Sequence, residues 1–362
     1  MVNFRISRSG PLQTVGTSTT SLGSDLHRRV RVGILNPLPG VLAHFEDAIV
    51  DNLELTEGIE AVRFSVKGAE MPEGAGQRDR LESALRLVVD ARRQIAASKV
   101  DCLINLWPTF GYLEPVVWRS LFLDAAVLTI LHDVTPLRPQ FGYCPQAIGP
   151  LRLGSEGRHS WIVHTADAQA EARALGLGEP TIIPHPILPE QVGEQTRDTD
   201  VLVFGQMKPA RDLELLAALG DELRKAGLRG RIVGRGWPSI EGWEVDDRFV
   251  PEEEVPGLLG SAKSLLLPYV HYYQSGVALR AIEVGTPVVG TRNGFLEDYL
   301  GADWRCFVEG SDPNDWLTAV ELAIAGGVSL NTVNLGVAAR GRIGEKWSEA
   351  LLRNFGGFAP SL

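Results

Sequence analysis

The stretch from Leu265 to Thr291 has the residue types and spacing that favour binding of an anion. It reads LLLPYVHYYQSGVALRAIEVGTPVVGT, in which an apolar strand ends at Pro268 and a tyrosine-rich loop leads to Ser275 and Gly276. Serine is favoured at the start of a helix, and the glycine beside it leaves backbone N–H groups open to an anion. A helix N-terminus at the end of parallel strands is suited to phosphate. We therefore predict a phosphate site here. It requires further partners, because one helix N-terminus contributes only about 0.3–2 kcal/mol.

A second motif, Gly234-Arg235-Gly236, follows the apolar segment RIV directly. Glycine triplets of this kind are common in turns, so the motif is informative only because it directly follows a predicted strand. We predict that Gly234 and Arg235 lie over a base or a diphosphate.

The elements that must position these residues alternate along the chain. Short continuous apolar runs separated by amphipathic segments are typical of a parallel sheet with helices on both faces. Predicted strands begin at Val30, Ala61, Asp101, Ala126, Ser160 and Thr181 and, later, at Val201, Arg231, Ser264, Pro287 and Arg305. Predicted helices include 78–97, 211–226, 252–261, one that starts at Ser275, 295–300 and one that starts at Asp312.

The alternation divides the chain into four parts. Residues 1–28 have no periodicity and are predicted to form a flexible arm. Residues 29–195 and 196–339 are predicted to be two α/β domains, each a Rossmann-like doubly wound parallel sheet, joined by a polar linker at 190–200. Residues 340–362 are predicted to form a last helix that packs back toward the N-terminal domain. The cleft between two such domains is the expected ligand site.

Composition excludes several classes of protein. A hydrophobic fraction of 44% and a charged fraction of 22% are those of a soluble globular protein, and no apolar run is long enough to span a membrane. We expect a cytoplasmic location, because Cys102, Cys144 and Cys306 form no disulfide or metal pattern and the N-terminus lacks a signal peptide. Peripheral association with a membrane stays open. The net charge of −10 gives no support to a nucleic-acid partner.

No metal site is predicted. Asp198-Thr199-Asp200 has an Asp-x-Asp pattern of the kind that can bind a metal, but here it lies in the predicted linker. The cysteines and histidines have no zinc spacing.

Several motifs together resemble a known family. VLVFGQMKPARDLELL opens the second domain, RIVGRGW and SGVALRAIEVGTPVV follow, and the first domain carries LHDVTP, IVHTADAQAEARALGLG and IIPHPI. The chain is similar to glycosyltransferases of the GT-B fold, and within them to the retaining family 4, also called group 1. The resemblance covers about residues 30–355. It implies that the C-terminal domain holds a nucleotide-sugar and the N-terminal domain holds the acceptor.

The resemblance also implies which residues grip the diphosphate. The family has an arginine and a lysine after the first strand of the second domain, near Gly205. The lysine position falls on Arg211 and the arginine position on Gln206, a departure that removes one positive charge and that Lys208 is close enough to offset. The alternative is that Lys208 and Arg211 form a solvated helix start. The resemblance also implies that backbone groups near Val250 bind the base of the nucleotide.

The family's two carboxylates, eight positions apart in an E-x7-E motif, are missing. Their positions fall on Tyr272 and Arg280. Arg280 lies one turn below Gly276, so its guanidinium could reach the phosphate. The alternative is an ion pair with Glu283. We expect four residues of the loop to line the donor pocket with hydroxyls and an amide: Tyr269, Tyr272, Tyr273 and Gln274.

Two histidines are candidate catalytic residues. His132 ends an apolar strand and precedes Asp133, as in the family's His-Asp segment, which implies contact with the donor sugar; the alternative is a histidine that bonds a backbone carbonyl. His44 follows the loop NPLPG, where inverting enzymes of this fold place a base.

The resemblance therefore implies a glycosyltransferase without a resident cofactor, in which Arg211 stabilises the leaving diphosphate. It implies retention of anomeric configuration without a metal or an enzymic base. The acceptor is not identified: it could be a glycan, a lipid-linked sugar, a small molecule or another polymer. Two alternatives stay open, a non-catalytic GT-B binding subunit and an inverting transferase with His44 as base. A dinucleotide-dependent oxidoreductase is disfavoured, because NPLPG stands in place of G-x-G-x-x-G.

Overall fold

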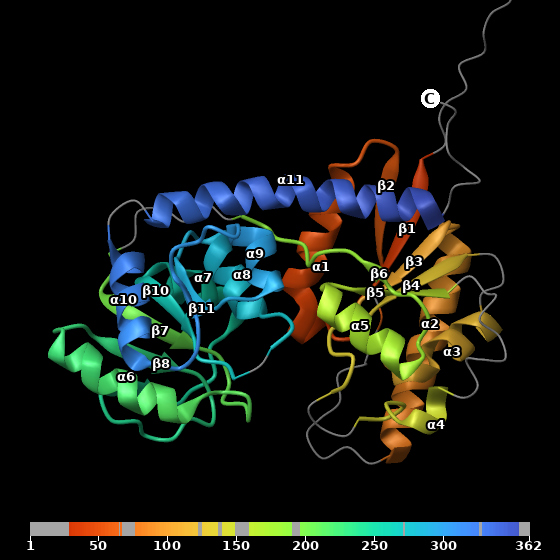
Figure 1. Cartoon of the computed structure of the whole chain (residues 1–362). Helices are drawn as coiled ribbons and strands as arrows, with labels where there is room; N and C mark the ends of the chain where they lie inside the picture. The colour runs from red at the N-terminus through yellow and green to blue at the C-terminus, as the bar shows by residue number, and fades with distance from the viewer. Residues whose placement is uncertain are drawn as a thin grey trace, which may run out of the picture.

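The computed structural model describes residues 29–64, 66, 77–121, 125–136, 140–148, 159–189, 196–270, 272–325 and 328–354. The predicted arm at 1–28 and most of the predicted linker, residues 190–195, lie outside this part of the chain. Figure 1 shows two α/β halves side by side, with one long helix crossing both.

The N-terminal half contains a parallel sheet in the order β2-β1-β3-β4-β5-β6. Its strands are β1 (Val30–Leu35), β2 (Ile59–Phe64), β3 (Cys102–Asn105), β4 (Ala126–Ile130), β5 (His159–Val163) and β6 (Thr181–Ile182). Its helices are α1 (Pro39–Glu54), α2 (Gln77–Ser98), η1 (Gly111–Leu113), α3 (Glu114–Leu121), α4 (Pro145–Ile148) and α5 (Ala166–Leu175).

The C-terminal half contains a parallel sheet in the order β12-β11-β10-β7-β8-β9. Its strands are β7 (Thr199–Phe204), β8 (Gly230–Val233), β9 (Trp243–Asp246), β10 (Ala262–Leu267), β11 (Val288–Thr291) and β12 (Phe307–Val308). Its helices are α6 (Leu213–Lys225), η3 (Glu252–Glu254), α7 (Val255–Gly260), α8 (Gly276–Glu283), α9 (Gly294–Leu300), α10 (Pro313–Ile324) and α11 (Val328–Asn354). The strand order reverses between β7 and β10, which is where an open α/β sheet binds its ligand. The prediction of two Rossmann-like parallel-sheet domains is confirmed.

The strands form where the sequence offers continuous apolar runs. Leu265, Leu266 and Leu267 of β10 are completely buried, as expected for a central strand covered on both faces. Strand β9 was missed by sequence analysis, because of its four residues WEVD only Trp243 is buried. The predicted linker was also too long: Thr199 and Asp200 begin β7, and Asp200 accepts hydrogen bonds from the Arg229 backbone and Lys263.

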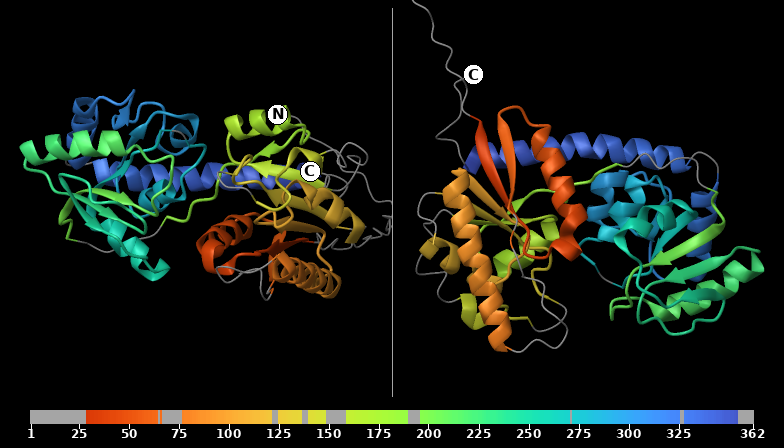
Figure 2. Two further views of the ribbon diagram at one scale, coloured as in Figure 1. Left: turned by 90° about the horizontal axis from the view of Figure 1, so that it is seen from below. Right: turned by 180° about the vertical axis from the view of Figure 1, so that it is seen from behind.

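Helix α11 joins the two halves and begins at Val328, earlier than the predicted start at residue 340. Figure 2 shows it passing along both halves in two views. Trp347 on it is fully buried, and Arg340 forms an ion pair with Asp51 of α1. The described helices include none that combines the length and apolarity needed to cross a membrane.

Candidate functional site

The loops after β7 and β8 approach each other too closely for side chains. Gly205 has φ +104° and Gly234 has φ +150°, both of which favour glycine. A Cβ at Gly234 would lie 2.1 Å from the Gly205 carbonyl oxygen. A Cβ at Gly205 would lie 3.3 Å from Arg211 Nη2 and 3.5 Å from Val277 Cγ2. Gly205 therefore lies against both Arg211 and the first turn of α8.

Arg211 is a buried cation, and two of its donor nitrogens have no partner among the described residues. It lies just before α6, since Asp212 caps that helix by accepting from the Leu215 N–H at 2.9 Å, so Arg211 is not the helical residue that sequence analysis allowed for. Its side chain is 4% exposed, its Nη2 donates to the Phe204 carbonyl at 2.8 Å, and its guanidinium lies 4.1 Å from the centre of the Tyr269 ring.

The remaining donors of Arg211 are suited to binding an anion. Its Nε and Nη1 have no hydrogen-bond partner in the part of the chain that the structure describes. Burial lowers the pKa of Arg211, but arginine stays protonated at neutral pH. A buried charge without a counter-charge costs several kcal/mol, roughly, and buried donors are almost always paired. The arrangement fits a phosphate group that accepts from both nitrogens.

The predicted helix start at Ser275 is confirmed. Ser275 is the N-cap of α8, and its Oγ accepts from the Ala278 N–H at 3.3 Å. A Cβ at Gly276 would meet open space, so the first turn of α8 is accessible to a ligand. Arg211 and the α8 N-terminus thus converge at Gly205, at the switch point of the sheet.

The loop before α8 reaches the N-terminal half. A hydrogen bond with Glu171 raises the pKa of Tyr273 to about 12. Gln274 donates to the His132 carbonyl at 3.1 Å and to His132 Nδ1 at 3.3 Å. The Tyr272 hydroxyl donates to the Thr291 carbonyl at 3.3 Å. Of the four residues predicted to line the donor pocket, Tyr273 and Gln274 therefore contact the other half, and Tyr269 stacks on Arg211.

His132 is a neutral histidine held at both ring nitrogens. Its Nε2 donates to the Leu106 carbonyl at 3.0 Å, and Nδ1 accepts from Gln274. Burial lowers its pKa to about 4. The ring stacks on Trp107 and contacts Phe45 edge-on. The bond to a backbone carbonyl that sequence analysis gave as an alternative is present. Contact with a donor sugar stays a prediction.

His44 and Arg280 lie in a cluster that bridges the two halves. His44 Nε2 is 2.8 Å from Glu283 Oε2, and Arg280 Nη1 is 2.6 Å from His44 Nδ1. Arg280 also pairs with Glu283 at 3.1 Å and with Glu252 at 3.0 Å. The ion pair with Glu283, the alternative to a phosphate role for Arg280, is therefore present. His44 has both ring nitrogens engaged.

Of the other predicted donor-site residues, three are exposed and one is buried. Gln206 and Lys208 are exposed, and the charge of Lys208 lowers the pKa of Asp133 in the other half, against the larger raising effect of burial. Arg235 is exposed over the ring of Phe249, 5.2 Å from its centre, while Val250 is buried.

Sequence analysis missed Glu171 and Trp237. Glu171 lies on α5 among residues with the pattern of a solvated helix face, and only the fold brings it to Tyr273. Trp237 follows the Gly234-Arg235-Gly236 motif, and its indole N–H donates to the Gly205 carbonyl at 2.8 Å, which fixes the loop after β7. Its position one residue past the motif was the available signal.

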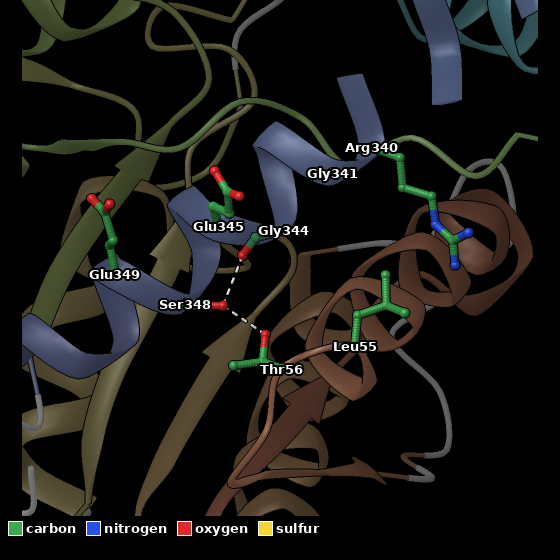
Figure 3. A pocket seen from close by; sticks show the side chains of 8 residues that line it. All are labelled: Leu55, Thr56, Arg340, Gly341, Gly344, Glu345, Ser348 and Glu349. Atoms are coloured by element: carbon green, nitrogen blue, oxygen red, sulfur yellow. Dashed lines mark hydrogen bonds between the residues drawn. The ribbon is translucent and has the colours of Figure 1, made fainter. Parts of the chain in front are cut away.

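A cavity of about 430 Å³ opens elsewhere, between α11 and the turn after α1 (Figure 3). Ser348 lies on its wall, 2.6 Å from the Thr56 hydroxyl, and Leu55 lines it. Its cation Arg340 is already engaged by Asp51. None of the residues around Arg211 line this cavity, so it is not the anion site. Within the described residues, no group of histidines, cysteines and carboxylates is arranged to hold a metal ion.

Comparison with known proteins identifies the fold. No protein-family model matches the chain. Sucrose-phosphate synthase from Thermosynechococcus elongatus superposes with a TM-score of 0.61 at 12% identity, over 91% of this chain and 100% of that chain. A glycosyltransferase from Rickettsia africae gives 0.60 at 9% identity, over 91% and 99%. The fold is GT-B. Anabaena HepE, solved with UDP and glucose, shares this GT-B fold with a TM-score of 0.54 at 11% identity, over 89% and 99%.

One curated relative matches in sequence. It is a 2-deoxystreptamine glucosyltransferase of Streptomyces kanamyceticus, 28% identical over 169 residues. The match spans 47% of this GT-B chain and 34% of the relative, about a third of its length. Membership of family 4 stays a prediction.

Proposed function

We propose that this GT-B protein is a glycosyltransferase that uses a nucleoside-diphosphate sugar as donor. The observation that supports this is the buried guanidinium of Arg211, with two unpartnered nitrogens among the described residues, beside the start of α8. A diphosphate would supply the missing anion and accept from the helix N–H groups. The curated relative, itself a glucosyltransferase, favours sugar transfer over phosphate binding alone.

In the proposed reaction the bond between the anomeric carbon and the phosphate oxygen breaks as the acceptor oxygen bonds that carbon on the same face. The acceptor proton passes to the leaving phosphate. Negative charge grows on the diphosphate, so the protein's contribution is fixed positive charge from Arg211 and the α8 N-terminus, with Lys208 at the rim. This scheme requires no enzymic base. We favour it over inversion, because Glu283 and Arg280 engage both ring nitrogens of His44.

A thermal-shift screen of UDP, GDP, TDP and ADP tests the donor. At 100 times its Kd, the correct nucleotide is expected to stabilise the folded protein by about 2.7 kcal/mol, because it binds only the folded state. For a domain of this size that corresponds to a rise in Tm of about 5–10 °C. If none of the four raises Tm, the proposed donor class is wrong.

The N-terminal half contributes carboxylates where the two halves meet. Glu171, Asp167 and Asp133 all act on the Tyr273 hydroxyl, and the hydrogen bond with Glu171 has the largest effect on its pKa. The curated relative is named for 2-deoxystreptamine, a cyclitol with two amino groups. Since carboxylates attract ammonium groups, we propose that the acceptor is polyhydroxylated and carries amino groups.

Glu171→Gln is expected to raise the KM for 2-deoxystreptamine about tenfold, the equivalent of about 1.4 kcal/mol. Glutamine keeps one acceptor oxygen, which can still accept from Thr135, and replaces the other carboxylate oxygen with an uncharged NH2 group, so the negative charge is lost. Initial rates with 2-deoxystreptamine and with neutral myo-inositol measure the effect, and Glu179→Gln, which alters an exposed ion pair with Arg173, is the control. Equal use of both acceptors by the wild type would rule out an amine requirement.

A further inference from the structure

Helix α8 serves both halves of the molecule. Its first residues form the anion site of the C-terminal half, and its last residue, Glu283, contacts the N-terminal half. Glu283 is 1% exposed. Its Oε1 accepts from the Leu188 N–H at 2.7 Å, and its Oε2 lies 2.8 Å from His44 Nε2. Figure 1 shows α1, which carries His44, beside α8 and α9.

Arg280 completes this contact from within α8. It donates to Glu283 at 3.1 Å, to Glu252 at 3.0 Å and to His44 Nδ1 at 2.6 Å. His44 thus lies between a carboxylate and a guanidinium: its Nε2 is within hydrogen-bond distance of Glu283, and Arg280 Nη1 is 2.6 Å from Nδ1 and 2.8 Å from Nε2.

The bonds of Glu283 to Leu188 and His44 form only in one arrangement of the two halves. Its partners Leu188 and His44 belong to the N-terminal half, whereas Glu283 belongs to the C-terminal half. Removing one partner of a buried charge leaves the other uncompensated, so such a network strongly favours the arrangement that satisfies every member.

We propose that Arg280, His44 and Glu283 form an interdomain latch that holds the N-terminal half against the last turn of α8 and so keeps His132 beside Gln274. Arg280 is then a positioning residue for transfer and not a ligand of the diphosphate. This explains how an arginine is used at the position where the family resemblance implies a carboxylate. The latch itself does not depend on the proposed function; only the activity measurement that tests it does.

Hydrogen exchange of the Leu188 amide tests the latch without any substrate. Arg280→Ala and His44→Leu are expected to speed exchange at Leu188 about tenfold, although neither residue contacts it, because the arrangement that protects it becomes less populated. His44→Gln keeps a donor and an acceptor and is expected to restore most of the protection. Arg292→Ala is the matched control, since Arg292 pairs with Glu297 and Glu309 within one half. Unchanged exchange in Arg280→Ala and His44→Leu would overturn the latch.

Binding and turnover separate the two roles of Arg280. With the latch broken in Arg280→Ala, nucleoside-diphosphate affinity is expected to stay within about twofold, while kcat/KM for transfer falls about tenfold. A loss of nucleotide affinity as large as the loss of transfer would make Arg280 a phosphate ligand and overturn the proposal. If the wild type transfers no sugar, the proposed function fails, and the exchange experiment still decides the latch.

Discussion

Arg211→Met is expected to lower the rate of glycosyl transfer by about two to three orders of magnitude, the usual loss for one fixed donor at a developing negative charge. The same change is expected to leave the free protein as stable as before, or more stable. Among the described residues, the guanidinium of the buried Arg211 contacts the Phe204 carbonyl and the rings of Tyr269 and Trp237, none of which carries a charge. Methionine fills a similar space and carries no charge, so it has no desolvation penalty for a buried charge.

A lower transfer rate combined with unchanged or higher stability distinguishes a ligand-binding arginine from a structural one. Calorimetric titration with the nucleoside diphosphate measures affinity, and thermal unfolding without ligand measures stability. Arg211→Lys keeps the charge but not the planar fork, so an intermediate loss is expected. Arg292→Met, at an exposed ion pair, should change neither quantity. A large drop in Tm for free Arg211→Met with unchanged affinity would show that Arg211 supports the fold only.

The fold could be predicted because its signals are local. Parallel strands buried on both faces require continuous apolar runs, and of the twelve strands in the described residues eleven begin within two residues of a predicted start. Strand β9 has no such run: Glu244 is exposed, Val245 and Asp246 are half-buried, and Trp243 alone anchors it. Its pairing with β8 decides its conformation, and a sequence pattern does not contain that pairing.

The same holds for the site: features that depend on neighbouring residues could be predicted, and contacts between distant residues could not. Ser275 could be identified because a helix cap depends on residues three positions apart. For Arg280, the ion pair with Glu283 three positions on was one of the alternatives, but the contacts with Glu252 and with His44, which lies 236 positions away, could not be identified. Nor does sequence distinguish the buried Arg211 from the exposed Lys208, since both precede the same helix. Only the packing of Tyr269 over Arg211 separates them.

Gly234→Ala is expected to destabilise the C-terminal half by about 3 kcal/mol or more. A non-glycine residue at φ +150° costs about 1–3 kcal/mol. The added Cβ would also lie 2.1 Å from the Gly205 carbonyl oxygen and 2.6 Å from its carbon. Both atoms belong to the backbone, so no side chain can turn away to relieve the overlap, which adds roughly 1–3 kcal/mol.

The overlap falls on Gly205, which lies against both Arg211 and α8, so stability and nucleotide affinity are both expected to decrease. Relief requires Gly205 to move, and Trp237 holds the Gly205 carbonyl in place. A fall in Tm of about 5 °C or more is expected, with the nucleotide-induced rise in Tm reduced in the surviving folded protein. Gly294→Ala is the control, because a Cβ there meets nothing within 4 Å. If Gly234→Ala binds nucleotide as tightly as the wild type, the loop after β7 does not form the diphosphate site, whatever the loss of stability.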